Sequence, residues 1–204
     1  MRLAPRFRRR RRVSNPAVAK AELRAQALSR RAGLSEEARQ AASRRAVAHL
    51  RAFLRPREIV SLFWPIRGEI DPRPLAHDVR RLGGMVLLPV VVGDRMIFRE
   101  WDESVPLDGG AFGTRHPPAT ARERDPDLVV APLAAFDRRG GRIGYGRGYY
   151  DAAIARLKER GRSPRVVGLS FAVQEVEACP MEPHDQALSA IVTEDGALDV
   201  EAAA

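Results

Sequence analysis

The twelve residues GGRIGYGRGYYD, Gly140 to Asp151, combine the residue types that proteins use to hold a chain of phosphates. The stretch contains five glycines and two arginines, and it ends in two tyrosines and an acid. Glycine lets successive backbone N–H groups point into one anion-binding concavity, and arginine adds bidentate hydrogen bonds to phosphate oxygens. Asp151 is a suitable ligand for Mg²⁺, which takes its remaining oxygens from substrate and water.

This glycine-rich loop lies between two predicted elements. DLVVA, residues 127–131, is typical of a buried strand, and a helix is predicted over residues 149–160. Parallel sheets bind ligands at the carboxyl ends of their strands, and helix N-termini attract phosphate. A glycine-rich turn in which Asp151 serves only the helix dipole would give the same pattern. Neither a Walker A loop nor a G-x-G-x-x-G motif is present, because Arg147-Gly148 follows Gly146.

Hydrophobic periodicity predicts helices that alternate with strands. Helices are predicted at 17–31, 36–54, 72–82 and 149–160, and strands at 58–64, 85–92, 95–101, 127–131, 165–171 and 190–193. Val18, Ala21, Ala25 and Leu28 recur at helical spacing in the first helix. Ser35 and Asp71 are predicted helix caps, Gly93-Asp94 predicts a hairpin, and residues 102–126 are interpreted as a long functional loop. The fold class predicted is α/β, with three layers: a mostly parallel, Rossmann-like sheet with helices on both faces and a hairpin insertion.

Composition bounds the class of protein. Of 204 residues, 45% are apolar and 30% charged, which is typical of a globular domain. No apolar run approaches the roughly 20 residues needed to cross a bilayer, so no membrane partner is expected. The single cysteine, Cys179, excludes an internal disulfide framework and the usual cysteine-based zinc sites. With no secretory signal pattern, we expect a cytoplasmic protein, and a monomer by default.

Most of the net charge of +9 lies in the first thirteen residues, MRLAPRFRRRRRV, which contain seven arginines and no acid. The rest of the chain carries a net charge of +2. We predict a basic, disordered tail over residues 1–16 and a single α/β domain over residues 17–204. The tail could bind RNA, DNA or anionic lipid weakly, or act as an organellar presequence, and we favour a simple upstream extension.

The longer segment FDRRGGRIGYGRGYYD, residues 136–151, closely resembles a family signature, G-x-R-L/I-G-x-G-x-G-Y-Y-D. The family is that of 5-formyltetrahydrofolate cyclo-ligase, or 5,10-methenyltetrahydrofolate synthetase, and the resemblance covers most of the chain beyond the arginine-rich start. Lys20-Ala21-Glu22-Leu23-Arg24 is similar to the family's N-terminal Lys-x-x-Leu-Arg segment. Phe63-Trp64-Pro65 with Gly68-Glu69-Ile70 is similar to its folate-contacting strand end, and Pro183-His184-Asp185 resembles its His-Asp element.

The resemblance implies a ligase that converts 5-formyltetrahydrofolate and ATP to 5,10-methenyltetrahydrofolate, ADP and phosphate. In the family mechanism the formyl oxygen attacks the γ-phosphate, N10 attacks the activated carbon, and phosphate leaves. In-line phosphoryl transfer of this kind asks mainly for positioning and charge neutralisation. The implied partners are ATP and 5-formyltetrahydrofolate, and the implied cofactor is Mg²⁺.

The resemblance also implies roles for individual residues. The expected ATP-binding residues are Lys20, Arg24, Arg142, Ile143, Gly144, Tyr145, Gly146, Arg147, Gly148, Tyr149 and Tyr150. The expected folate-binding residues are Trp64, Glu69, Tyr145, Gly146, Arg147, Gly148 and Tyr149. Asp151 and Asp185 are expected to hold Mg²⁺, and Arg142, Arg147 and Tyr149 to act in the chemical step. Glu69 would accept hydrogen bonds from the amino and ring N–H groups of the pterin.

Several of these residues could instead have a purely structural role, and that alternative stays open at this point. Lys20 and Arg24 could be solvated helix charges, Trp64 could be ordinary core, and Tyr150 could pack beneath the loop. His116 stands where the family often has an acid, which leaves the contacts of its loop open. Two other functions also stay open: a nucleotide-binding paralogue without folate activity, and an RNA-associated accessory protein that acts through its tail.

Overall fold

The computed structural model describes residues 16–182 and 185–200. Among these residues, seven strands form one sheet in the order β11-β10-β9-β6-β1-β2-β3. The five central strands are parallel: β1 (Ile59–Ser61), β2 (Met85–Val92), β6 (Leu128–Pro132), β9 (Arg165–Leu169) and β10 (Ala190–Thr193). At the two edges, β3 (Arg95–Glu100) and β11 (Gly196–Asp199) run antiparallel to their neighbours. The mostly parallel sheet and the β2–β3 hairpin confirm the prediction.

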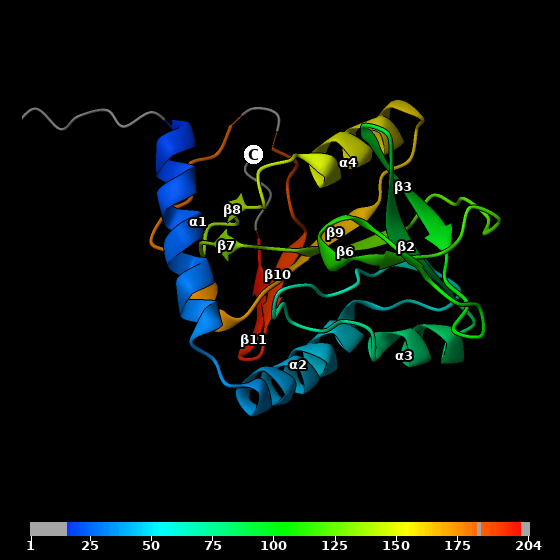
Figure 1. Ribbon diagram of the computed structural model, residues 1–204, viewed down its shortest axis with the longest axis horizontal. Helices are drawn as coiled ribbons and strands as arrows, with labels where there is room; N and C mark the ends of the chain where they lie inside the picture. Colours follow the sequence, from blue (N-terminus) through cyan, green and yellow to red (C-terminus); the bar gives the residue numbers. More distant parts are fainter. Residues whose placement is uncertain (1–15, 183–184, 201–204) are drawn as a thin grey trace, which may run out of the picture.

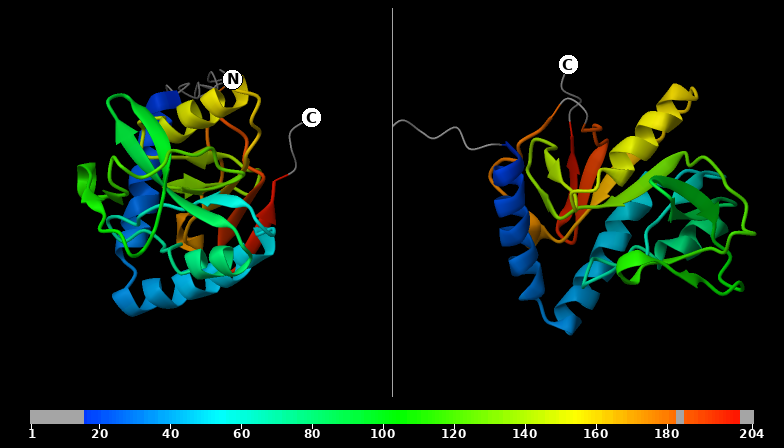
Figure 2. Two further views of the ribbon diagram at one scale, coloured as in Figure 1. Left: turned by 90° about the vertical axis from the view of Figure 1, so that its right-hand side faces the viewer. Right: turned by 45° about the horizontal axis from the view of Figure 1, so that its top comes forward.

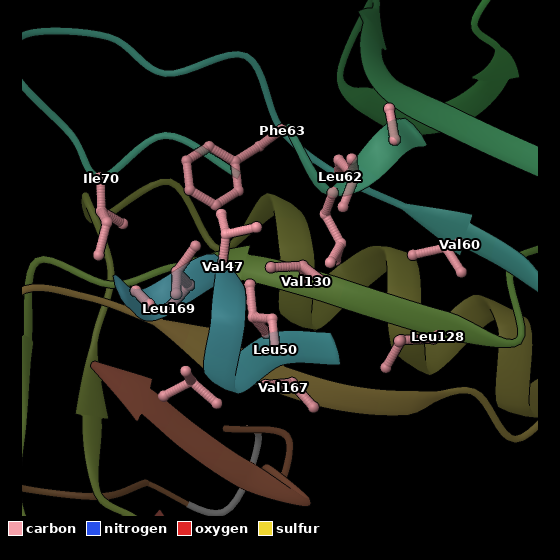
Figure 3. Packing of buried hydrophobic residues seen from close by; sticks show 14 of the residues in the cluster. Val47, Leu50, Val60, Leu62, Phe63, Ile70, Leu128, Val130, Val167 and Leu169 are labelled. Carbon is pink, nitrogen blue, oxygen red and sulfur yellow. The ribbon is translucent and has the colours of Figure 1, made fainter. Parts of the chain in front are cut away.

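Helices cover both faces of the sheet (Figure 1). α2 (Glu36–Leu50) and α3 (Leu75–Arg81) lie on one face, and α4 (Tyr149–Glu159) lies on the other. Val130 and Val167 belong to the cluster under α2 and α3 (Figure 3), whereas their neighbours Val129 and Val166 belong to the cluster under α4. Because both faces of the sheet are buried, its strands are apolar at consecutive positions. The predicted three layers are therefore confirmed.

α1 (Pro16–Ala32) stands beside these layers and diverges from α2 after a short connection at residues 33–35 (Figure 2). It packs against the small sheet of β7 (Ala135–Phe136) and β8 (Arg142–Ile143), where Ala27 meets Ala135 and Ile143. The prediction of the helix is confirmed, and so is Ser35 as the cap of α2, because its hydroxyl accepts from the N–H of Ala38 at 3.2 Å.

The apolar spacing in α1 did not identify its covered face. Val18 is 50% exposed, and Ala21 and Ala25 are exposed as well. In this helix Ala27 and Arg31 are buried, and the partly buried residues are Ala19, Lys20, Leu23, Arg24 and Leu28. Steps of four and seven residues put Lys20, Arg24 and Arg31 on one side of a helix of 3.6 residues per turn. α1 thus presents cationic side chains to the rest of the protein.

Several boundaries differ from the prediction. α3 begins at Leu75 rather than Pro72, since the N–H groups of Leu75 and Ala76 bond three residues back and form turns. Asp71 caps that turn, not the helix, and accepts from the N–H of Arg73 at 3.0 Å. The first strand ends at Ser61, before Pro65. The predicted loop at 102–126 contains β4 (Asp108–Gly109), β5 (Arg115–His116) and a 3₁₀ turn, η2 (Ala111–Gly113). The edge strand β11 was not predicted.

The topology brings two loops together at one place in the sheet. From β1 the chain passes through α3 to β2 on one side, whereas β6 lies on the other side of β1 and leads away to β9 and β10. Open α/β sheets bind ligands at such a switch point, beyond the carboxyl ends of the strands. Trp64 and Glu69 follow β1 here, and the glycine-rich loop follows β6. No helix in the described part of the chain is long and apolar enough to span a membrane.

Candidate functional site

The glycine-rich loop lies between the predicted strand β6 and the predicted helix α4 and leads into the N-terminus of α4. The short strands β7, before the loop, and β8, within it, were not predicted. Gly146 has a φ of 90°, and Gly148, the N-cap of α4, has a φ of 63°. Both values lie in the left-handed region that favours glycine. The first N–H groups of a helix have no partner within it, so this end of α4 offers donors to an anion.

Glycine is required at different positions of the loop for different structural reasons. A Cβ on Gly140 would lie 2.1 Å from Val200 Cγ1, and one on Gly141 would lie 2.5 Å from Asp137 Oδ2. At Gly144 no described atom lies within 4 Å of the Cβ position, and φ is outside the left-handed region. Neither packing nor backbone conformation requires glycine at 144, whereas a ligand that approaches the backbone closely would.

Asp137 fixes the start of this loop and was missed in the sequence analysis. Its buried carboxylate accepts from the N–H groups of Arg139 (2.8 Å), Gly141 (3.0 Å) and Cys179 (2.6 Å). Burial, with the charge of Asp137, raises the pKa of the Cys179 thiol to about 12, so this cysteine is protonated at neutral pH and is no nucleophile. An acid followed by glycine three and four residues later was the available signal for this turn.

Asp151 lies in the first turn of α4 and contacts the backbone of Gln186. Its Oδ1 accepts from the N–H of Gln186 at 3.0 Å and forms an ion pair with Arg142. Arg142 also donates to the carbonyl of Gln186, and its side chain is only 8% exposed. The arginine predicted to bind phosphate therefore contacts the predicted metal ligand in this structure.

Lys20 brings α1 to the second predicted metal ligand. Its Nζ lies 2.7 Å from Glu182 Oε2 and 2.9 Å from Asp185 Oδ2. Burial disfavours the charge of Lys20, but the hydrogen bonds to Glu182 and Asp185 outweigh it, so its pKa lies above the ordinary value. Asp185 precedes Gln186, whose N–H bonds to Asp151, so both acids adjoin one short stretch of backbone. Glu182 was not predicted.

The donor set suits a metal ion that is shared with phosphate. Mg²⁺ usually takes one or two carboxylates and completes its shell with phosphate and water oxygens. In the described ranges, no group of three or more His, Cys, Asp or Glu side chains is arranged to hold a metal by itself. Asp151 and Asp185 thus fit magnesium held jointly by protein and nucleotide. Pro183 and His184 of the predicted His-Asp element lie outside the described residues.

Arg24 lies at the rim of the loop. Its Nε donates to the carbonyl of Gly144 at 2.7 Å, and its guanidinium is the group nearest to the Cβ position of Gly146, at 3.5 Å. Arg147 is exposed, whereas the side chain of Ile143 is buried beside α1, which leaves only its backbone to face a ligand. The partly buried Tyr149 and Tyr150 pack against the cluster under α4.

A polar network lies behind the loop. Glu69 is 9% exposed; its Oε2 accepts from the N–H of Ile66 at 2.9 Å, and its carboxylate is hydrogen-bonded to the hydroxyl of Tyr145. Arg31 Nη1 donates to the Tyr145 hydroxyl at 2.7 Å, and Nη2 donates to the carbonyl of Arg67 at 3.0 Å. Arg31 was missed, although it lies seven residues after Arg24 on the same helix face.

The pKa values in this network follow from burial. Burial raises the pKa of Glu69, and the hydroxyl of Tyr145, the N–H of Ile66 and the charges of Arg31 and Arg67 oppose that rise. Burial, together with the charge of Glu69, raises the pKa of Tyr145 above its ordinary value. Tyr145 therefore keeps its proton and can donate it to Glu69 in a hydrogen bond.

Trp64 lies near the start of the loop after β1, three residues beyond Ser61. Its ring meets Trp101 edge-on, with centroids 6.3 Å apart, and packs partly against the core. The guanidinium of Arg73 lies over the Trp64 ring at 4.4 Å, and that of Arg115 lies at 6.0 Å. The predicted apolar wall is thus lined by cations as well. His116, next to Arg115, bonds through Nδ1 to the carbonyl of Pro117 at 3.1 Å.

Comparisons with known proteins show the family and the fold of the chain. A model of the 5-formyltetrahydrofolate cyclo-ligase family matches residues 16–194. The 5-formyltetrahydrofolate cyclo-ligase of Escherichia coli strain K12 is 31% identical over 141 residues, which cover 66% of this chain and 76% of that enzyme. The one from Mycolicibacterium smegmatis is 27% identical over 183 residues, covering 85% and 93% of the two chains. The solved structure of 5,10-methenyltetrahydrofolate synthetase from Aquifex aeolicus is similar with a TM-score of 0.73 at 29% identity, covering 91% of this chain and 94% of that one.

Proposed function

Because the chain belongs to the 5-formyltetrahydrofolate cyclo-ligase family, we propose that it closes 5-formyltetrahydrofolate to 5,10-methenyltetrahydrofolate at the expense of ATP. One observation carries the proposal beyond family membership. The glycine-rich loop, the acids Asp151 and Asp185, and the buried carboxylate of Glu69 converge at the switch point of one sheet. The residues that we propose for a phosphate chain and those that we propose for a nitrogen-rich ring therefore lie next to each other.

In the proposed reaction, the formyl oxygen of the substrate attacks the γ-phosphorus of ATP, and ADP leaves. The phosphorylated oxygen is then a good leaving group. N10 attacks the formyl carbon and loses its proton, and the carbon–oxygen bond breaks with release of phosphate. The former formyl oxygen departs in that phosphate, and a new carbon–nitrogen bond closes the ring. No protein nucleophile is required, so catalysis consists of positioning and charge neutralisation.

We assign the phosphate chain to the backbone N–H groups of residues 144–148, with Arg147 and the α1 residues Lys20 and Arg24 as cationic partners. Asp151 and Asp185 would hold Mg²⁺, which supplies positive charge to the phosphates when bound. Arg142 adjoins both groups through its ion pair with Asp151. Tyr145 and Tyr149 would line the boundary between the two substrates.

The pterin is assigned to the neighbourhood of Glu69, which lines a cleft of about 480 Å³ with Asp71 and Arg73. Glu69 would accept hydrogen bonds from the amino and ring N–H groups of the pterin, and Trp64 would form one wall. Glu69→Gln is expected to lower kcat/KM by about 10- to 100-fold, since a hydrogen bond to a charged group contributes about 1.5–3 kcal/mol. The same change is expected to leave the melting temperature at pH 7 unchanged or raised, because the variant no longer buries a charge.

The pH dependence of stability separates the two effects of Glu69. Its pKa in the folded protein lies above the ordinary 4.5, so the folded state binds the proton more tightly than the unfolded chain. Wild-type stability should therefore fall as the pH rises from 4.5 through the raised pKa, and Glu69→Gln should lack this loss. Melting curves of both proteins between about pH 4 and 8 measure it. A variant less stable than wild type at pH 7 would contradict this role for burial.

The assay for the proposed function follows the absorbance of 5,10-methenyltetrahydrofolate in the presence of 5-formyltetrahydrofolate, ATP and Mg²⁺. We expect turnover that requires all three. Nucleotide binding without turnover would favour a paralogue that lacks folate activity. Residues 1–15 lie outside the described residues, and we propose that the domain of residues 17–204 is sufficient, so a chain without residues 1–13 should keep full turnover. Loss of turnover on that deletion would assign the tail a part in catalysis. The cytoplasmic location and the monomeric state stay predictions.

A further inference from the structure

Arg31, in the last turn of α1, is a buried cation, with 5% of its surface exposed. Its guanidinium donates to two neutral oxygen atoms, the hydroxyl of Tyr145 and the carbonyl of Arg67. It also lies over the Tyr145 ring, 6.0 Å from the centroid. Burying a charge is costly unless its hydrogen bonds are satisfied, so these contacts fix the side chain in one place.

The two acceptors of Arg31 belong to different loops. Arg67 has a φ of 51°, which is uncommon without glycine, and it lies in the turn closed by the hydrogen bond from the N–H of Glu69 to the carbonyl of Ile66 at 3.0 Å. Tyr145 belongs to the glycine-rich loop, and its hydroxyl is hydrogen-bonded to Glu69. One guanidinium thus joins the loop after β1 to the loop after β6, across the switch point.

We propose that Arg31 is a positioning residue that couples the proposed folate site at Glu69 to the glycine-rich loop through the hydroxyl of Tyr145. The inference rests on the proposed function, since it takes Glu69 and the glycine-rich loop as the two substrate sites. A phosphate chain that orders the loop at Tyr145 also orients the Glu69 carboxylate. Nucleotide therefore raises the affinity for 5-formyltetrahydrofolate, and the folate raises the affinity for nucleotide by the same factor.

Arg31 also affects the charge of Glu69. The groups that act on this carboxylate are Arg31 from α1, Arg67 from its own turn and Tyr145 from the glycine-rich loop. Burial, and then the charge of Glu69, raises the pKa of Tyr150 in α4. Arg39, Asp71 and Arg73 line an open cleft of about 480 Å³ together with Glu69. Removing Arg31 takes away a cation that favours the ionised carboxylate. Folate binding should then begin to fail at a higher pH as the solution is acidified.

The test measures binding rather than turnover. The dissociation constant of 5-formyltetrahydrofolate is determined by calorimetry, with and without Mg²⁺ and a non-hydrolysable ATP analogue. For the wild type we expect nucleotide to tighten folate binding by about 10-fold, within the usual range of such coupling. Arg31→Met should bring that factor close to one and move the acid limit of folate binding to higher pH. Tyr145→Phe, which removes a single hydroxyl, should lose the coupling in the same way.

Arg30→Met is the matched control. Arg30 precedes Arg31 in α1 and likewise donates to backbone carbonyls, those of Val173 (2.5 Å) and Glu175 (2.8 Å), which lie outside the proposed network. This variant should keep the wild-type coupling factor. Arg31→Lys keeps the positive charge without the two-branched donor, so it should restore the acid limit of binding but not the full coupling.

The outcomes distinguish the inference from the function on which it rests. A wild type that binds both ligands without coupling, or variants Arg31→Met and Tyr145→Phe that keep the coupling, would overturn the inference and leave the proposed function standing. A wild type that binds neither ligand would overturn the proposed function. If melting curves show that Arg31→Met is unfolded, the coupling factor of Tyr145→Phe alone tests the inference, because this variant leaves the guanidinium of Arg31 in place.

Discussion

Replacement of Asp151 by asparagine is expected to lower kcat by about 100- to 1000-fold and to leave the protein folded, the loss typical for a group that stabilises transition-state charge. Asparagine keeps the size of the side chain and an oxygen that can accept from the N–H of Gln186. It loses the negative charge that pairs with Arg142 and that would hold Mg²⁺. Steady-state rates over a range of magnesium concentrations, with a melting curve, measure both effects.

Asparagine is chosen because alanine would confuse two effects. Without a carboxylate at 151, and with no acceptor in its place, the nearly buried guanidinium of Arg142 would lose a partner and the fold would be weakened. Asp78→Asn is the control: Asp78 in α3 is likewise paired with an arginine, Arg51 at 2.8 Å, but it lies away from the glycine-rich loop. It should keep wild-type turnover. Unchanged rates in Asp151→Asn would remove the metal assignment.

Two glycines in one loop are expected to respond in opposite ways to the same change. Gly144→Ala should keep the wild-type melting temperature, since no described atom is near the new methyl group. It should lower kcat/KM for ATP by about 100-fold, because displacing a phosphate chain by about 1 Å misaligns the reacting atoms. Gly141→Ala should instead cost about 1–3 kcal/mol of stability, because its methyl group would clash with the carboxylate of Asp137.

Calorimetry with ATP and melting curves of the two variants test this pair. The folded fraction of Gly141→Ala should bind ATP nearly as the wild type does. If Gly144→Ala binds ATP with wild-type affinity, the open space at this position does not receive the phosphate chain, and the triphosphate must be assigned elsewhere.

Local signals made much of the fold predictable. The strands of the central sheet are short apolar runs between proline and glycine breaks, and the helix after the glycine-rich loop starts at Tyr149 as predicted. The β2–β3 hairpin follows from Gly93-Asp94 between two apolar runs. Each of these features depends on neighbouring residues, so a pattern of a few residues carries it. The order of strand, glycine-rich loop and helix was predictable for the same reason, but the pair of short strands β7 and β8 was not.

What the sequence pattern missed depends on contacts between distant segments. The apolar spacing did not identify the covered face of α1, because this helix docks on a small hairpin and its loop, where backbone carbonyls and carboxylates favour cations over apolar side chains. Arg31 is separated from Tyr145 by more than a hundred residues, and no spacing rule joins them. Asp137 and Cys179 are 42 residues apart, and Lys20 and Glu182 are 162 residues apart. The roles assigned to the site residues are predictions that measurements of ligand binding and turnover test.

The ion pairs of Arg142 with Asp151 and of Lys20 with Asp185 have a consequence for how the protein receives its ligands. Each acid has its own counterion, which offsets the repulsion between the two carboxylates. The basic side chains are also already immobilised beside the place where phosphates are expected. Their rotational freedom was given up during folding, so recruiting them to an incoming anion sacrifices little further entropy. The basic side chains are thus preorganised by their ion pairs with the two acids.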